Sequence, residues 1–372
     1  METDGRPRRI GVIGGGQLGR MLILAGRPLG FQFGVLDRGQ SAPAAAIADR
    51  FITGDLYDGA ALEDLTSWAD VTTFEIEHTD TEALAELARR GARIVPEARL
   101  LALINDKLRQ KRSLSEAGVS VPPFWAEHPG TFPVVQKLRH GGYDGRGVAV
   151  LSGPSDPVLD GVSYYEEKIA LQAELAVIVA RRQSGQVVAY PAVDMEFHPI
   201  ANIVTGVVMP ARVPVDVQAR ATEIAIHAVE TLGGIGILAV ELFWAENGEI
   251  LVNEIAPRPH NSGHLTIEAC ETSQFEQHLR AICDIPLGSA QIRCAAASVN
   301  LLGMPDASGP PNLRNIPALM EHPRAHVHWY DKSEVRPFRK MGHVTITAER
   351  SEDAVRAIEA LGRLVWIGGT GE

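Results

Sequence analysis

The hydrophobic pattern of residues 10–96 alternates between short apolar runs and segments with helical spacing. Apolar runs predict strands at 10–13, 31–36, 51–53, 71–76 and 94–96. Helical spacing predicts helices at about 17–25 and 58–68, and a third after residue 80. Repeated strand–helix units fold into a parallel sheet covered by helices on both faces. The chain is therefore expected to begin with a doubly wound α/β domain.

A glycine-rich segment, GGYDGRG at residues 141–147, separates two apolar runs that predict a strand pair. Glycine lets backbone N–H groups approach phosphate oxygens, and Lys137 would add a positive charge just before the loop. Glycines alone are as typical of a mobile surface hairpin. The interleaved Tyr143, Asp144 and Arg146 favour a lid over an anionic ligand.

A second strand pair is predicted by the apolar runs 236–245 and 250–256. The sequence Asn247-Gly248 between them is typical of a two-residue type I′ turn. That turn would place Glu241 opposite Glu254. In the same register, the expected partners are Phe243 with Val252 and Ala245 with Ile250.

Two facing carboxylates repel each other by roughly 3 kcal/mol at a separation of about 5 Å and an effective dielectric of about 20. A bound divalent cation would remove this conflict, and oxygen ligands suit Mg²⁺ that bridges nucleotide phosphates. The alternatives are that one glutamate is protonated or that the register slips. The pair Glu241 and Glu254 is thus a candidate metal site.

The remaining segments predict a mixture of helices and sheet. Helices are expected at 105–118, 216–232 and 351–361, and the chain from Cys294 onward alternates as an antiparallel sheet does. Together with the N-terminal units, this predicts an α/β and α+β protein.

Composition limits the kinds of protein that the chain can be. Its 372 residues suggest two or three domains, and 45% hydrophobic with 22% charged residues fits a globular protein. A net charge of −11 argues against nucleic-acid binding and requires that any cationic pocket be local. Cys270, Cys283 and Cys294 have neither disulfide nor zinc spacing, which suggests a reducing, cytoplasmic location. No apolar run of about 18 residues predicts a membrane span.

The segment Gly14–Gly19 contains G-x-G-x-x-G, and Asp37 follows about 20 residues later. On its own this pattern is the fingerprint of a dinucleotide site, so a nicotinamide dehydrogenase is one alternative. The physical content is narrower, namely a helix N-terminus that can hold a phosphate. Glu75 lies at the end of a predicted strand, where open α/β sheets bind ligands.

These motifs together resemble the N5-carboxyaminoimidazole ribonucleotide synthetase family of ATP-grasp enzymes. The resemblance rests on Lys137 with GGYDGRG, on GGGQLGRM at residues 14–21, and on NEIAPRPHNSGH at residues 253–264. It implies a three-domain ATP-grasp architecture. The expected domains are a ribonucleotide-binding domain at 1–106, a small lid domain at 107–170 and a C-terminal domain at 171–372.

The resemblance also implies an activity. ATP, bicarbonate and 5-aminoimidazole ribonucleotide would give ADP, phosphate and N5-carboxyaminoimidazole ribonucleotide through carboxyphosphate, a step of purine biosynthesis. The implied cofactors are ATP and Mg²⁺, and members of this family usually form homodimers. The alternatives are another ATP-grasp ligase, such as the formate-dependent glycinamide ribonucleotide transformylase, and a non-catalytic nucleotide-binding protein.

The family motifs carry over onto four sets of residues. The nucleotide would be bound by Lys107, Lys137, Gly142, Tyr143, Asp144, Gly145, Arg146, Gly147, Val148, Glu166, Glu167, Lys168, Ile169, Glu174, His198, Asn253 and Glu254. The expected catalytic residues are Tyr143, Asp144, Arg146, Arg258, His260 and Asn261. The ribonucleotide would contact Gly16, Gln17, Leu18, Glu75, Lys332 and Arg339. The metal would be held by Glu241 and Glu254. The chain departs from the family pattern at Val148 and Phe338.

Overall fold

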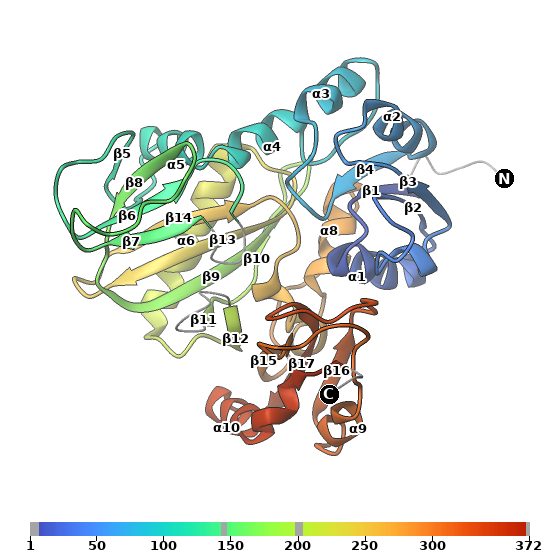
Figure 1. The fold of residues 1–372 in the computed structure, drawn as a ribbon. Helices are drawn as coiled ribbons and strands as arrows, with labels where there is room; N and C mark the ends of the chain where they lie inside the picture. The colour runs from blue at the N-terminus through green and yellow to red at the C-terminus, as the bar shows by residue number, and fades with distance from the viewer. Residues whose placement is uncertain (1–6, 143–146, 198–203, 370–372) are drawn as a thin grey trace.

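The structure is a computed structural model that describes residues 7–142, 147–197 and 204–369. Within these residues the strands form three sheets, of four, ten and four strands. Figure 1 shows the N-terminal sheet in blue at one side of the long sheet, with the small sheet in blue-green to green at the other end.

The N-terminal sheet is parallel and has the strand order β3-β2-β1-β4. Its strands are β1 Arg9–Ile13, β2 Gln32–Asp37, β3 Arg50–Thr53 and β4 Val71–Phe74. Its helices are α1 Gln17–Gly26, α2 Gly59–Trp68 and α3 Thr81–Arg89, with short 3₁₀ turns at η1 Arg27–Leu29 and η2 Ala45–Ile47. The prediction of a doubly wound domain is confirmed.

Alternation along β1 distributes its side chains between the two faces of this sheet. Ile10 and Val12 pack in a cluster with α1, whereas Ile13 packs in a second cluster with α2. The first cluster also contains Phe275 and Leu279 of α8 Gln274–Ile282, so α1 is covered by a helix that lies much later in the chain. The N-terminal domain and the C-terminal part of the chain therefore share one hydrophobic core.

The long sheet has the strand order β14-β13-β9-β11-β12-β15-β17-β16, with β10 beside β9 and β18 beside β15. Its strands are β9 Leu171–Arg181, β10 Val187–Ala189, β11 Val193–Phe197, β12 Val204–Met209, β13 Gly236–Ala245, β14 Ile250–Ala256, β15 Ala295–Gly303, β16 Ala325–Trp329, β17 Lys340–Ala348 and β18 Trp366–Ile367. All pairings are antiparallel except that of β15 with β18. The antiparallel sheet predicted after Cys294 is confirmed.

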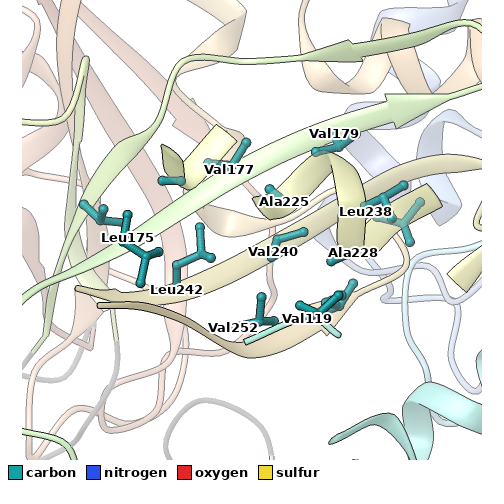
Figure 2. Packing of buried hydrophobic residues seen from close by; sticks show 14 of the residues in the cluster. Val119, Leu175, Val177, Val179, Ala225, Ala228, Leu238, Val240, Leu242 and Val252 are labelled. Carbon is teal, nitrogen blue, oxygen red and sulfur yellow. The ribbon is translucent and has the colours of Figure 1, made fainter. Parts of the chain in front are cut away.

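The second half of β9, from Leu175 to Ala180, is buried on both faces, which explains its continuous apolar run. Leu175, Val177 and Val179 point toward helix α6 Val215–Leu232 and pack with Val240 of β13 (Figure 2). The intervening residues of β9 belong to a separate cluster on the opposite face. A strand buried on both sides needs apolar residues at every position, so alternation is absent there.

The small sheet has the order β5-β8-β6-β7. Its strands are β5 Phe124–Trp125, β6 Val134–Leu138, β7 Val148–Leu151 and β8 Ser163–Glu167. The predicted hairpin is confirmed, with Lys137 of β6 opposite Val148 of β7.

Two helices, α4 Ala98–Asn105 and α5 Lys107–Glu116, lead from the first domain to the small sheet. The helix expected at 105–118 corresponds to α5 but begins later, at Lys107, because Asp106 is its N-cap and Asn105 is the last residue of α4. The Asp106 carboxylate accepts the Arg109 N–H at 3.2 Å and caps α5. An N-cap residue has extended backbone, so α4 must end before it.

The C-terminal part contributes the remaining helices. These are η3 Asn261–Gly263, α7 Thr266–Ala269, α9 Asn315–Leu319, α10 Ser351–Leu361 and η4 Gly362–Val365. Helix α10 has the bounds expected from the sequence. None of the helices in the described part of the chain is long and apolar enough to cross a membrane.

Candidate functional site

A cavity of about 400 Å³ lies between the small sheet, the end of the first domain and the β13–β14 hairpin. Most of the residues predicted to bind nucleotide, metal or bicarbonate line it. They are Lys107, Lys137, Gly142, Val148, Glu166, Glu167, Lys168, Ile169, Glu174, Glu241, Asn253, Glu254, Arg258, His260 and Asn261. The lining does not include Gly147, Gly16, Gln17, Leu18, Glu75, Lys332 or Arg339.

The β13–β14 hairpin places Glu241 opposite Glu254, as expected, but by a different route. The turn is not type I′, which needs positive φ at both central residues. Among the described non-glycine residues, only Asp284, Asp331 and Phe338 have positive φ, so Asn247 does not, while Gly248 has φ +84°. The Ala245 N–H donates to Glu249 O at 2.9 Å, which makes a three-residue turn with a left-handed glycine.

The longer turn shifts the first pairs by one residue. Phe243 faces Leu251, not Val252, and Trp244, not Ala245, faces Ile250, so these two expected pairs are wrong. A β-bulge between Glu241 and Leu242 restores the register by leaving Asn253 as the extra residue on β14. A bulge turns successive side chains toward the same face, and Asn253 and Glu254 both line the cavity.

The two facing glutamates have very different proton affinities. The Lys107 ammonium lies 2.7 Å from the Glu254 carboxylate and lowers the pKa of Glu254 to about 2. Burial, followed by the charge of Glu254, raises the pKa of Glu241 to about 8. Without a bound cation, the repulsion expected from the sequence is therefore relieved by a proton on Glu241 and by Lys107.

A second lysine, Lys137, connects β6 to the same hairpin. Its ammonium donates to Asn253 Oδ1 at 2.8 Å and lies 2.7 Å from the Glu166 carboxylate. The Glu166 side chain is almost completely buried and also accepts the Tyr164 hydroxyl at 2.8 Å. The Glu166 carboxylate is thus engaged within the protein, and its neighbours 167–169 line the cavity beside it.

The sequence interpretation did not single out Lys111, which is 1% exposed and lies behind the hairpin. Its ammonium donates to the carbonyls of Val252 and Asn253 at 3.2 and 2.7 Å and pairs with Glu166 at 3.0 Å. Burial lowers the pKa of Lys111 to about 8. Burial opposes the charged form of Glu166 as well, but Lys111 and Lys137 outweigh it and lower its pKa to about 2. The pair is therefore charged at neutral pH, and Lys111 holds the carbonyls of the bulge.

Glu174, expected beside the ribose, lies on β9 and faces Phe243 of β13. Burial raises the pKa of this carboxyl to about 7. A half-protonated carboxyl can both donate and accept a hydrogen bond, which suits a sugar hydroxyl.

Residues after β14 form another wall of the cavity. The Arg258 guanidinium lies 2.8 Å from the carboxylate of Glu77, a residue that follows β4 and also lines the cavity. His260 Nε2 lies 3.5 Å from Glu241 Oε1. Glu77 thus connects the first domain with this wall through an ion pair.

The glycine turn before α1 differs from the expectation. The Gly16 and Gly19 amides donate to the Glu75 carboxylate at 2.6 and 2.8 Å, and the Gly15 amide donates to Asp37 at 2.7 Å. The protein's own carboxylates therefore accept three of the amides in this turn, and the phosphate site expected at Gly14–Gly19 stays a prediction. Burial raises the pKa of Glu75, although the amides of Gly19 and Gly16 oppose this.

Lys332 and Arg339 lie in the connection between β16 and β17. The Lys332 ammonium donates to Lys340 O at 2.6 Å, and the Arg339 guanidinium donates to Glu334 O at 2.7 Å. This connection touches the first domain, where Arg20 of α1 lies 3.7 Å from Asp331. Lys340 is a further basic residue that the sequence interpretation missed, and it lines the cavity.

Two departures from the family pattern have different consequences. Val148 lines the cavity through its place on β7. Phe338 has φ +57°, a conformation that glycine adopts easily, and its ring packs edge-on against Trp366 at 6.2 Å. A glycine at this position would adopt this backbone conformation without strain. The predicted residues Tyr143, Asp144, Gly145, Arg146 and His198 lie outside the described residues.

The donor groups of the hairpin fit Mg²⁺. Among the described residues, no set of three or more His, Cys, Asp or Glu side chains is placed to hold a metal ion. Mg²⁺ is commonly held by one or two carboxylates together with substrate phosphates and water. Glu241 and Glu254 offer such a pair, and the raised pKa of Glu241 is the expected sign of a buried carboxyl near a second carboxylate.

Comparison with known proteins agrees with this geometry. Residues 8–105 match the ribonucleotide synthetase preATP-grasp domain, 125–275 the ATP-grasp domain, and 296–357 the phosphoribosylaminoimidazole carboxylase C-terminal domain. The N5-carboxyaminoimidazole ribonucleotide synthases of Synechococcus elongatus and Bacillus subtilis are 41% and 34% identical. These matches cover 95% and 94% of this chain and 93% and 94% of the relatives.

Solved structures agree as well. N5-carboxyaminoimidazole ribonucleotide synthetase from Thermotoga maritima superposes with a TM-score of 0.91 at 40% identity, over 97% of this chain and 99% of the other. An Aspergillus clavatus enzyme solved with ADP and 5-aminoimidazole ribonucleotide gives 0.88 at 34% identity, over 97% and 99%. This chain therefore has the ATP-grasp fold and belongs to the N5-carboxyaminoimidazole ribonucleotide synthase family of ATP-dependent ligases.

Proposed function

We propose that this protein carboxylates 5-aminoimidazole ribonucleotide with bicarbonate and ATP, giving N5-carboxyaminoimidazole ribonucleotide, ADP and phosphate in purine biosynthesis. The observation that carries this proposal is the arrangement of Glu241, Glu254, Lys107 and Lys137 around one cavity. That arrangement suits phosphoryl transfer, which depends on positioning and on charge stabilisation.

The reaction begins with attack of a bicarbonate oxygen on the γ-phosphorus of ATP. The bond to the β–γ bridging oxygen breaks, and ADP leaves with its electron pair. Lys107 and Lys137 offset the negative charge on the transferring group. Mg²⁺ held by Glu241 and Glu254 would supply further positive charge at the same phosphates.

The product of this step is carboxyphosphate. The exocyclic amine of the ribonucleotide then takes the carboxyl carbon, from carboxyphosphate or from the CO₂ that it releases. The amine loses one proton, and phosphate leaves. Arg258, His260 and Asn261 would face the carboxyl group and the imidazole, since they line the wall of the cavity after β14.

The ribonucleotide would bind where the first domain meets the β16–β17 connection. Gly16, Gln17, Leu18 and Glu75 lie on one side of this junction, and Lys332 and Arg339 lie on the other. Since Glu75 accepts the Gly16 and Gly19 amides, the positive charge for the substrate phosphate would come from Lys332 and Arg339. Charged hydrogen bonds of this kind are worth roughly 1.5–3 kcal/mol each.

Nucleotide binding completes the assignment of the cavity. Lys107, Lys137, Gly142 and Val148 would contact the phosphates, with Asn253 and Glu254 on the facing hairpin. Residues 167–169 would present backbone groups to the adenine, and Glu174 would bind the ribose. Glu166 would act from behind, through its ion pairs with Lys111 and Lys137.

The domain limits at residues 106 and 170 stay a prediction. Helix α5 is relevant to them, because Leu114 at its end belongs to the same hydrophobic cluster as β9, β13 and α6.

We also propose a cytoplasmic homodimer, on the basis of the family resemblance and of three cysteines that are free in the structure. Light scattering coupled to gel filtration measures the oligomeric state.

The experiment that tests the function is the substrate dependence of ADP release. We expect the full rate to require both bicarbonate and 5-aminoimidazole ribonucleotide. Faster turnover with formate and glycinamide ribonucleotide would instead establish the transformylase activity, and no turnover with tight ATP binding would indicate a non-catalytic protein. Titration with NADH against ATP tests the dehydrogenase alternative, which the family assignment argues against.

A further inference from the structure

Four buried glutamines use their carboxamides in the same unusual way. In each case the side-chain oxygen accepts the N–H, and the side-chain nitrogen donates to the C=O, of one and the same residue. A neighbouring strand would make the same two bonds. The pairs are Gln110 with Ile255, Gln136 with Leu159, Gln274 with His260, and Gln277 with Gly288.

Gln274, the first residue of α8, holds His260, which lines the cavity. Its Oε1 accepts the His260 N–H at 2.9 Å, and its Nε2 donates to His260 O at 2.7 Å. The other Nε2 proton points to His264 Nδ1 at 3.3 Å. Gln274 is 0% exposed, and a Cβ on Gly263 would lie 2.4 Å from its oxygen, so the carboxamide has no room to turn away.

His260 needs such a partner because of the sequence around it. β14 ends at Ala256, and Pro257 and Pro259 have no N–H to donate to a strand neighbour. His260 itself is extended, with φ −130° and ψ 156°, and is the N-cap residue of η3. Gln110 holds Ile255 by bonds of 3.0 and 3.1 Å, so the segment 255–260 is fixed at both ends by glutamines.

The backbone of His260 determines where its ring points. The Ser262 N–H donates to His260 Nδ1 at 3.3 Å, which makes Nδ1 an acceptor. In the neutral ring the proton is then on Nε2, which lies 3.5 Å from Glu241 Oε1. A shift of the His260 backbone would move this N–H donor away from the cavity wall.

We propose that Gln274 is a positioning residue for the carboxylation reaction, and that it acts by holding the His260 backbone so that Nε2–H faces Glu241 and the cavity. This inference rests on the function proposed above. Gln274 itself does not line the cavity and touches no reacting group. Its effect on catalysis passes through His260.

The chain contains a matched control on the same helix. Gln277 lies three residues after Gln274, is also 0% exposed, and clamps Gly288 by two bonds of 2.8 Å. Gly288 does not line the cavity. A substitution at Gln277 therefore removes the same two bonds from the same helix without touching the site.

The experiment compares Gln274→Leu with Gln277→Leu in the full-length protein. We expect similar decreases in Tm, because each variant leaves one buried N–H and one C=O without a partner. kcat should fall by about tenfold to a hundredfold in Gln274→Leu, with the KM for ATP within about twofold. Gln277→Leu should keep kcat within about twofold of the parent. Equal kcat in both variants at equal loss of Tm would overturn the proposal.

A second measurement does not depend on turnover. In protein with ¹⁵N-labelled histidine, the ring signals of His260, assigned with His260→Gln, report the tautomer and pKa of the imidazole. We expect Gln274→Leu, but not Gln277→Leu, to shift these signals. Unchanged signals would contradict the positioning role even if the carboxylase assignment holds. A shift in a protein without bicarbonate-dependent ADP release would support the positioning and reject the function.

Should the leucine variants not fold, the shape-preserving pair Gln274→Glu and Gln277→Glu gives the same comparison. Each glutamate keeps an oxygen acceptor but loses the donor to the backbone carbonyl. The proposal again requires the His260 signals and kcat to change at position 274 and to stay as in the parent at position 277.

Discussion

The cavity beside the β13–β14 hairpin and the glycine turn before α1 both offer groups to an anionic ligand, but their charges are arranged in opposite ways. In the cavity, Lys107 and Lys137 are present before any ligand, each next to a carboxylate. In the glycine turn, backbone amides are present, and carboxylates of the protein accept three of them.

This difference shows what each region needs from its ligand. On the function proposed above, a phosphate with its metal ion would enter the cavity with loss of the proton from Glu241, since the cation would take over the role of that proton. A phosphate cannot take the amides of Gly16 and Gly19 unless Glu75 moves away. In this structure the glycine turn is thus a helix start capped by Glu75 and not an open phosphate cradle.

The largest expected effect is in the cavity. Glu254→Gln should lower kcat by about a hundredfold and weaken the binding of Mg²⁺ and ATP, because it removes one carboxylate of the pair. The fold should persist, because the amide oxygen of the new side chain can still accept from Lys107 and the proton on Glu241 already relieves the repulsion. Turnover measured over a range of Mg²⁺ concentrations tests this expectation.

Glu246→Gln is the control for that variant, because Glu246 is exposed at the turn of the same hairpin. It should leave turnover unchanged. Near-normal activity of Glu254→Gln at ordinary Mg²⁺ would contradict the metal-binding role of Glu254 and, with it, the contrast drawn between the cavity and the glycine turn.

The next effect concerns the junction with the first domain. Lys332→Ala and Arg339→Ala should each raise the KM for the ribonucleotide by about tenfold to a hundredfold and leave the KM for ATP nearly unchanged. Arg336→Ala is the control, because Arg336 is exposed on the same connection and pairs with Glu334. If the KM for the ribonucleotide stays within about twofold in both test variants, the glycine turn must bind the phosphate after all.

A smaller effect appears as a pH dependence of stability. The pKa of Glu241 in the fold is raised to about 8 from an ordinary value of 4.5, so the folded state holds a proton that the unfolded state lacks between these pH values. The stabilisation is full below pH 4.5 and is lost as pH rises through about 8. In metal-free protein, the parent should lose up to about 1.4 kcal/mol per pH unit relative to Glu241→Gln.

Denaturant unfolding of the parent and of Glu241→Gln across this range measures the slope. Glu254, with a pKa of about 2, adds no slope at pH values well above its ordinary value of 4.5, because it is ionised in both states there. If the difference in unfolding free energy between the two proteins does not change with pH, the pKa values of Glu241 and Glu254 are not separated as described.

The smallest effect tests the glycine turn. Glu75→Ala should lower the free energy of unfolding by about 1 kcal/mol, the usual cost of losing a helix cap. Asp58→Ala, which removes the ordinary N-cap of α2, should cost about the same. Only Glu75→Ala should also raise the KM for the ribonucleotide. Equal KM values would restrict Glu75 to a structural role.

The sequence alone determined the features that depend on neighbouring residues. The strand–helix alternation of the first domain and the small hairpin followed from periodicity, because side chains of a strand or helix repeat at fixed spacing. The sequence also placed Glu241 opposite Glu254, although the turn predicted for this hairpin was of the wrong type. The extra residue of the actual turn and the bulge at Asn253 cancel, and the Asn-Gly sequence is compatible with both turns.

Only the tertiary structure decided which distant groups meet at the site. Lys111 holds carbonyls more than a hundred residues away, and no rule of local spacing predicts that, although Lys107 and Lys111 lie one turn apart on α5. Local spacing likewise does not predict that Glu75 accepts an amide at the start of α1, or that Gln274 bonds to the backbone of His260. Buried polar groups must find partners wherever the fold offers them, so their identity is fixed by packing, not by sequence neighbourhood.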